Sequence, residues 1–206
     1  MMAFLLQGLF LALPAVIVPS SLKVFLISRT LRDGWRSVWP ATFTPLITDI
    51  PIALLVLLIL RQTPGWFFSL LQIGGGLFVM YLAWKLVPFL KTGGVSYEPA
   101  SPEQTIRTMS QAVGINFLNP IPYIFVSSVI VPRTLSGWQL SPPHALAFLL
   151  GFYGALIGGM LALILVFDLA GRLNPKINMA LLVISILALI VLGIQQVWAG
   201  LSALLA

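Results

Sequence analysis

Residues 41–60 read ATFTPLITDIPIALLVLLIL, an apolar stretch long enough to cross a lipid bilayer as a helix. Asp49 lies near its middle, between Pro45 and Pro51. A carboxylate at the centre of a bilayer costs about 2.5–3.5 kcal/mol on insertion scales, and an interior proline removes a backbone donor that lipid cannot replace. We therefore expect Asp49 to face the interior of a helix bundle, where other parts of the protein offset both costs.

The composition of the whole chain is that of an integral membrane protein. Of its 206 residues, 59% are hydrophobic and 8% are charged, and the mean hydropathy is +1.05. The polar stretches are all short, which predicts one membrane domain, residues 1–206, without a sizeable soluble module. The net charge of +6 comes from basic residues scattered between apolar segments. They do not form the continuous basic face that binding to nucleic acid needs, so we expect no nucleic-acid partner.

Six apolar runs are long enough to span a bilayer, which predicts an all-α, polytopic membrane protein. They cover about residues 3–27, 38–60, 66–90, 109–132, 144–167 and 177–203. The odd-numbered loops and their flanks hold eight basic residues and the even-numbered loops two: Arg29, Arg32, Arg36, Lys85, Lys91, Arg107, Arg172 and Lys176 against Arg61 and Arg133. The excess of positive charge predicts cytoplasmic odd loops and both termini outside.

The longest polar stretch divides the chain into two halves of three spans each. It is rich in Gly, Ser and Pro, and predicts a linker over about 92–107 between halves of about 1–91 and 108–206. Each half has a glycine six residues before a proline in its first span, Gly8 with Pro14 and Gly114 with Pro120. Because three spans per half reverse the direction of insertion, we expect two inverted three-helix repeats, as secondary transporters have.

Prolines interrupt the first, second and fourth spans. Such breaks either line a cavity or kink a helix for packing, and they expose half-helix N-termini that attract carboxylates. We expect a polar site for a substrate or coupling ion at the membrane midplane, where these breaks meet. Its candidate residues are Pro14, Pro19, Ser20, Ser21, Asp49, Asn116, Asn119 and Pro120.

Several of these polar residues also have a purely structural interpretation. Asp49 either binds a cation or proton, or caps a second half-helix that begins near Pro51. Asn116 and Asn119 either hold a polar ligand or satisfy the kinked backbone. Lys23 either extends toward the cytoplasmic interface or pairs with Asp49, and we expect the former.

The remaining ionisable residues indicate no second site. Asp168 lies four residues before Arg172, which predicts an interfacial ion pair. The single histidine, His144, has no ligand partners in the sequence, so we expect no metal site, and we expect no cofactor. Gly154 and Gly158 form a small-xxx-small pattern for close helix approach, either within the fold or between subunits of a homo-oligomer.

The segment PSSLKVFLISRTLRDGWRSVWPATFTPLITD, residues 19–49, resembles the lysine exporter (LysE/RhtB) family. That family has a Pro-Gly-Pro motif, then a serine-arginine stretch, a loop glycine next to arginine, and a Gly-Asp pair. Here Pro19, Gly34 and Asp49 match at intervals of fifteen residues. In the second half, GINFLNPIPYIF is similar to the family's Asn-Pro segment through Asn119 and Pro120. The chain departs from the pattern at Ser20-Ser21, at Ile121 and at Thr48, which replaces the glycine before the aspartate.

The resemblance implies ion-driven export of amino acids or similar small solutes across the bacterial cytoplasmic membrane. Asp49 would then bind the substrate ammonium or a coupling proton. Two alternatives stay open, a non-transporting assembly or regulatory membrane protein on the same fold and a metal-ion exporter. An enzyme is disfavoured because the chain has no cysteine and only one histidine. We expect an amino acid-like small molecule and the lipid bilayer as the partners of this protein.

Overall fold

The computed structural model describes residues 1–58, 65–91 and 101–205, and every regular element in these ranges is a helix. This confirms the predicted fold class. Most of the predicted linker, residues 92–100, and Arg61 of the second loop lie outside the described residues. Residues 102–107, expected as the end of the linker, form the first turns of a helix instead, because Ser101 and Gln104 make a reciprocal capping box at its start.

Among the described residues, four helices or helix runs are long and apolar enough to cross a membrane by themselves, and two bent pairs raise the number to six if each pair is one span. The single spans are Trp35–Val56, Trp66–Leu90, Pro142–Leu173 and Pro175–Leu205. Each corresponds to one predicted apolar run. The first run and the fourth run, expected at about 3–27 and 109–132, are the two bent pairs.

The first bent pair consists of α1 (Met2–Ile17) and α2 (Ser21–Asp33), which meet at an angle of 66°. The second consists of α6 (Pro102–Phe117) and the run α7 (Pro120–Phe125), η3 (Val126–Ile130) and α8 (Val131–Leu140), with a bend of 62°. The bends follow Val18 and Leu118, where Pro19 and Asn119-Pro120 interrupt the helical hydrogen bonds. These bends agree with the breaks predicted in the first and fourth spans, whereas the second span, which was also predicted to be interrupted by prolines, runs over Trp35–Val56 as a single span without such a bend.

Other prolines do not break their helices. Pro14 lies within α1, and Pro51 lies within α4 (Thr44–Leu58), which begins after α3 (Trp35–Val38) and the 3₁₀ helix η1 (Trp39–Phe43). The expected equivalence of Pro14 and Pro120 is therefore wrong. Pro14 lies before the end of its helix, whereas Pro120 is the first residue of α7 and its ring suits that position.

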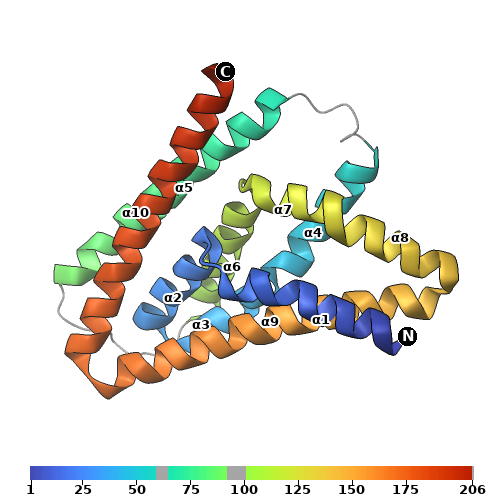
Figure 1. Ribbon diagram of the computed structural model, residues 1–206. Helices are drawn as coiled ribbons and strands as arrows, with labels where there is room; N and C mark the ends of the chain where they lie inside the picture. Colours follow the sequence, from blue (N-terminus) through green and yellow to red (C-terminus); the bar gives the residue numbers. More distant parts are fainter. Residues whose placement is uncertain (59–64, 92–100, 206) are drawn as a thin grey trace.

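The closest helix pairs join the two halves of the chain. In Figure 1, α1 runs along α9 (Pro142–Leu173), and α5 (Gly65–Lys91) runs along α10 (Pro175–Leu205). Glycines allow the close approach, since a Cβ on Gly8 would collide with the carbonyl oxygen of Phe148, and a Cβ on Gly76 would lie 2.5 Å from the carbonyl oxygen of Gly193. The halves predicted from the sequence are therefore intertwined.

The small-xxx-small pair Gly154 and Gly158 takes no part in this packing. A Cβ at either position would meet no atom within 4 Å in the described residues. Their neighbours on α9, Gly151 and Gly159, approach Leu5 and Val16 of α1 instead.

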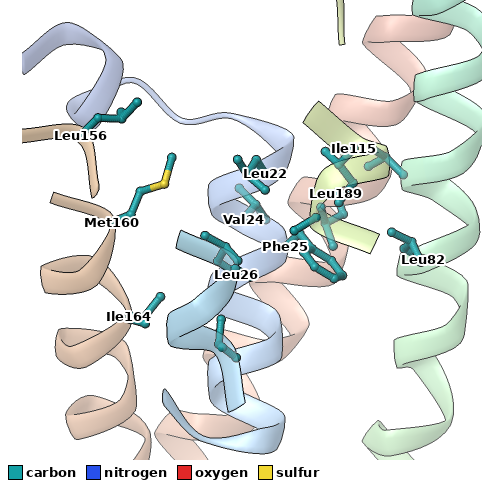
Figure 2. Close-up of a cluster of buried hydrophobic side chains, with 14 of the residues drawn as sticks. Leu22, Val24, Phe25, Leu26, Leu82, Ile115, Leu156, Met160, Ile164 and Leu189 are labelled. Atoms are coloured by element: carbon teal, nitrogen blue, oxygen red, sulfur yellow. The ribbon is translucent and has the colours of Figure 1, made fainter. Parts of the chain in front are cut away.

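The helix α2 forms the centre of the molecule. Its apolar side chains belong to one buried cluster with Leu156, Met160 and Ile164 of α9 and with Leu82, Ile115 and Leu189 of α5, α6 and α10 (Figure 2). Most of its residues are buried, and the buried set includes polar side chains: Lys23, Ser28, Arg29 and Thr30. Large apolar side chains on the outer faces of α5, α9 and α10 are exposed instead, as expected where lipid is the solvent. A central helix with polar residues is typical of a bundle whose interior has a function.

Candidate functional site

Asp49 faces the interior of the bundle, as its position in the apolar run predicted. Only 7% of its surface is exposed, and its Oδ2 accepts a hydrogen bond of 3.0 Å from the hydroxyl of Tyr153 on α9. The hydroxyl of Thr48 lies 3.5 Å from Oδ1. Since α4 continues through Asp49 and Pro51 to Leu58, Asp49 does not cap a second half-helix, and that alternative is wrong.

Thr48 connects this carboxylate to the second bent pair. The side-chain amide of Asn116 on α6 donates a hydrogen bond of 2.6 Å to the Thr48 hydroxyl, which in turn donates to the carbonyl oxygen of Thr44 at 3.0 Å. The four residues Thr48, Asp49, Asn116 and Tyr153, here called the Asp49 cluster, thus join α4, α6 and α9. The Thr44 hydroxyl, one turn away, is buried and has no hydrogen-bond partner among the described residues.

The second bend lies directly beyond Asn116. Asn119 caps α7, because its Oδ1 accepts a hydrogen bond of 3.0 Å from the backbone N–H of Ile121. The Tyr123 hydroxyl reaches back across the bend and donates to the carbonyl oxygen of Phe117 at 2.9 Å. Of the two alternatives for the asparagines, the structural one holds for Asn119, whose side chain binds the backbone of the bend, whereas Asn116 belongs to the Asp49 cluster.

The first bend has the same arrangement with a charged group. The Ser20 hydroxyl caps α2 by accepting a hydrogen bond of 3.4 Å from the backbone N–H of Lys23. The Lys23 ammonium donates to the carbonyl oxygens of Ala15 at 2.7 Å, Val16 at 3.0 Å and Val18. Lys23 is 5% exposed, so it neither extends to the interface nor pairs with Asp49. It instead supplies donors to the carbonyl groups at the end of α1 that the bend leaves without helical partners.

The structure brings only part of the predicted site together. Asp49 and Asn116 lie in one cluster, and Asn119 and the buried Pro120 follow at the adjoining bend. At the first bend, the side chains of Pro14 and Pro19 are exposed and Ser21 is buried. In the described part of the chain, no hydrogen bond links this bend to the Asp49 cluster. That both bends belong to one site stays a prediction.

Sequence reasoning missed Tyr153 and the role of Thr48. Tyr153 lies in the middle of a long apolar helix, where a phenol needs a polar partner, and that requirement could have paired it with the one midspan carboxylate. In the sequence, Thr48 was noted only because it replaces the glycine of the Gly-Asp pair in the lysine exporter family. The substitution supplies the hydroxyl that joins Asn116 to the carboxylate.

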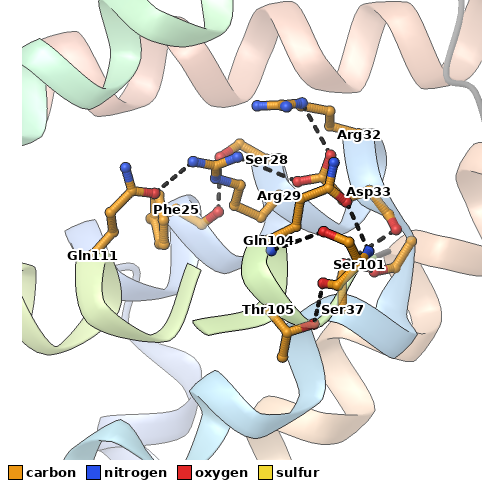
Figure 3. A network of polar contacts seen from close by, with 11 residues as sticks. Phe25, Ser28, Arg29, Arg32, Asp33, Ser37, Ser101, Gln104, Thr105 and Gln111 are labelled. Atoms are coloured by element: carbon orange, nitrogen blue, oxygen red, sulfur yellow. Dashed lines mark hydrogen bonds and ion pairs between the residues drawn. The ribbon is translucent and has the colours of Figure 1, made fainter. Parts of the chain in front are cut away.

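Polar side chains from the odd-numbered loops gather at one end of the bundle. Asp168 forms the predicted ion pair with Arg172 at 2.6 Å, and it also accepts a hydrogen bond of 3.1 Å from the backbone N–H of Trp35 at the start of α3. Gly34 precedes Trp35 with a φ of 77° and has no side chain to cap α3, so Asp168 of α9 supplies the acceptor. Figure 3 shows a second network at this end, around Arg29 and Asp33.

The described residues contain no cluster of three or more His, Asp or Glu side chains that could hold a metal ion. The Nδ1 of His144 lies 2.7 Å from the Ser141 hydroxyl, and its ring meets Phe4 edge-on at 5.4 Å. These contacts give the histidine a structural role at the start of α9.

A sequence model of the LysE type translocator family matches residues 13–195, which cover most of the chain and include both bends and the Asp49 cluster. The chain belongs to this family. Members of the LysE family are transporters and not enzymes, and membership indicates a multi-pass membrane protein that exports amino acids or other small solutes. No curated protein and no solved structure matches the chain significantly.

Proposed function

We propose that this LysE family protein is an ion-coupled secondary transporter with its site at the Asp49 cluster. The observation that supports this proposal is a carboxylate, 7% exposed, in the middle of a span and hydrogen-bonded to Tyr153 of another helix. Ionisable groups within a membrane are costly and usually functional. The exported substrates are amino acids or related small solutes.

In this proposal Asp49 binds the ammonium group of the substrate or a coupling proton. Asn116 and Thr48 supply amide and hydroxyl groups to the same site. The N-terminus of α2, which begins at the first bend, attracts the substrate carboxylate through its backbone N–H groups. The start of α7 offers no such group, because Pro120 and Pro122 have no N–H and the N–H of Ile121 already donates to Asn119. A proton moving inward releases about 2.3 kcal/mol per 100 mV, enough to drive a severalfold gradient of exported solute.

The proposed topology is six spans in two inverted repeats, in a bacterial inner membrane with both termini outside. Two bends of 66° and 62°, each in the first span of its half, support the repeat. The gathering of odd-loop residues such as Arg29, Asp168 and Arg172 at one end supports a common, cytoplasmic side for these loops. A homo-oligomer remains part of the proposal, with exposed Gly154 and Gly158 on an outer face of α9.

The test compares efflux of labelled amino acids from preloaded vesicles that contain wild type, Asp49→Asn or Glu103→Gln. Glu103 is an exposed carboxylate at the start of α6 and serves as the matched control. We expect Asp49→Asn to lower the efflux rate at least about tenfold, because a charged partner contributes 1.5–3 kcal/mol, and Glu103→Gln to leave the rate unchanged. Equal efflux by wild type and Asp49→Asn contradicts the role of the carboxylate.

The rival functions make different predictions in the same vesicles. A non-transporting assembly protein shows no efflux with wild type and no thermal stabilisation by any member of a small-solute panel, since only a real site shifts stability by mass action. A metal-ion exporter shows stabilisation by divalent cations alone. No contact among the described residues favours either rival over the amino-acid exporter.

A further inference from the structure

The network at the cytoplasmic end of α2 has more positive than negative charge. Arg29 and Arg32 share one carboxylate, Asp33, at 3.3 and 3.0 Å. Arg107 on α6 lies close enough to repel both guanidinium groups. Within the described residues, Asp33 is the only carboxylate in ion-pair distance of Arg29 or Arg32. Three positive charges therefore face one negative charge.

The guanidinium of Arg29 is buried although its charge is incompletely compensated. The side chain is 9% exposed, and its Nη1 contacts Asp33. Its Nη2 donates to the neutral amide oxygen of Gln111 on α6 at 2.5 Å, as Figure 3 shows. Its Nε is buried without a hydrogen-bond partner in the described part of the chain. Burying an unpaired charged donor is costly, so this arrangement favours an additional acceptor.

The unfilled position lies on an edge of the guanidinium that suits a carboxylate. Nε and Nη2 point the same way, and two parallel N–H bonds from such an edge fit the two oxygens of a carboxylate. Here Gln111 occupies one half of the edge with a single neutral oxygen. A carboxylate in its place satisfies both donors and supplies the missing negative charge.

We infer that the Nε–Nη2 edge of Arg29 is a binding site for the carboxylate of a small solute at the cytoplasmic end, and that the solute displaces Gln111. The bond from Arg29 to Gln111 joins α2 of the first half to α6 of the second. Displacement therefore breaks a contact between the two helices and couples solute binding to their separation. The orientation of this end and the identity of the solute as cargo rest on the proposed function.

The test measures the thermal unfolding midpoint of the purified chain in phosphatidylcholine nanodiscs, in potassium acetate and in potassium chloride of equal concentration. Acetate carries a carboxylate and no ammonium, so it probes Arg29 without requiring Asp49. We expect acetate to raise the midpoint of the wild type by about 2–4 °C relative to chloride near saturation. No such rise in the wild type overturns the inference.

Variants assign the effect to the guanidinium edge. Gln111→Glu places a resident carboxylate on this edge and is expected to fold with a midpoint in chloride at or above that of wild type. We expect acetate to bind Gln111→Glu at least about tenfold more weakly than it binds wild type. We expect the same loss for Arg29→Lys, because lysine lacks the planar edge. The control is Arg36→Gln, which removes an exposed arginine from α3 and should respond as wild type does. An equal response in Gln111→Glu and wild type overturns the inference.

Two further measurements distinguish a solute site at Arg29 from a lipid site and from the Asp49 cluster. Phosphatidylglycerol in the nanodisc, in place of acetate, could raise the unfolding midpoint through Arg29. If it does so and acetate has no effect, the Nε–Nη2 edge binds a lipid phosphate, which overturns the solute assignment. A response of Asp49→Asn to acetate that equals the wild-type response supports a site distinct from the Asp49 cluster. If acetate binds through Arg29 while vesicles show no efflux, the transport proposal fails and this inference stands.

Discussion

The two bends of the molecule solve one problem with different chemistry. At each bend the first helix ends with unpaired carbonyl groups and the second begins with unpaired N–H groups. Ser20 and Asn119 cap the second helices, and Lys23 and Tyr123 reach back to the carbonyl groups. The first bend thus buries a charge, whereas the second is neutral. A phenol is sufficient to close such a bend, so the ammonium at the first bend adds an electrostatic property that closure alone does not require.

Removing that ammonium should produce the largest effect on stability. Lys23→Met leaves the carbonyl oxygens of Ala15, Val16 and Val18 without this donor, and we expect a loss of about 3 kcal/mol or more in the free energy of unfolding. Denaturant unfolding in detergent measures it. Lys176→Met, which changes an exposed lysine on α10, is the control and should cost less than about 0.5 kcal/mol. Equal losses in both variants contradict the capping role of Lys23.

The corresponding change at the second bend should have a smaller effect. Tyr123→Phe removes one neutral hydrogen bond to the Phe117 carbonyl oxygen and keeps the ring in its contacts with Phe68 and Phe117. We expect a loss of about 1.5 kcal/mol in the same unfolding measurement. Tyr81→Phe, at a half-exposed position on α5, serves as the control. A loss as large as that of Lys23→Met removes the distinction between the bends.

Removing the N-cap side chains of α2 and α7 should have the smallest effect on stability. Asn119→Ala is expected to cost about 1 kcal/mol and Ser20→Ala about 0.5 kcal/mol, because the bond to Asn119 is 3.0 Å long and the bond to Ser20 3.4 Å. Thermal unfolding of both variants beside wild type ranks them. The reverse order contradicts this comparison of the caps.

The sequence predicts the long elements and the burial of Asp49 because both follow from the cost of polar groups in lipid. Helix bounds near 66–90 and 177–203 need only an apolar run of sufficient length. Proline marks the candidate breaks, but Pro14 and Pro51 lie within continuous helices, so the sequence alone does not select Pro19 and Pro120 as the broken positions. The partner of Asp49 could not be predicted in this way. Tyr153 lies 104 positions further along the chain, and its contact with Asp49 depends on how α4 and α9 pack.

The error about Lys23 has a similar cause. Sequence position alone allows a long side chain to extend toward water, and the nearest interface was the natural choice. The bend of 66° instead brings the end of α1 within reach of the ammonium. The geometry of a bend is set by packing against other helices, which the local sequence does not contain. The expected match of Pro14 with Pro120 failed for the same reason.

The glycine contacts between α1 and α9 and between α5 and α10 restrict how the protein can move. Each pair combines one helix from the first half with one from the second, at backbone distances that leave no room for a methyl group at Gly8 or Gly76. Rocking of the two halves as intact blocks would have to break both of these helix contacts. If the protein switches between inward-facing and outward-facing forms, we expect α1 to move together with α9 and α5 together with α10, and the central helices between these pairs to change position.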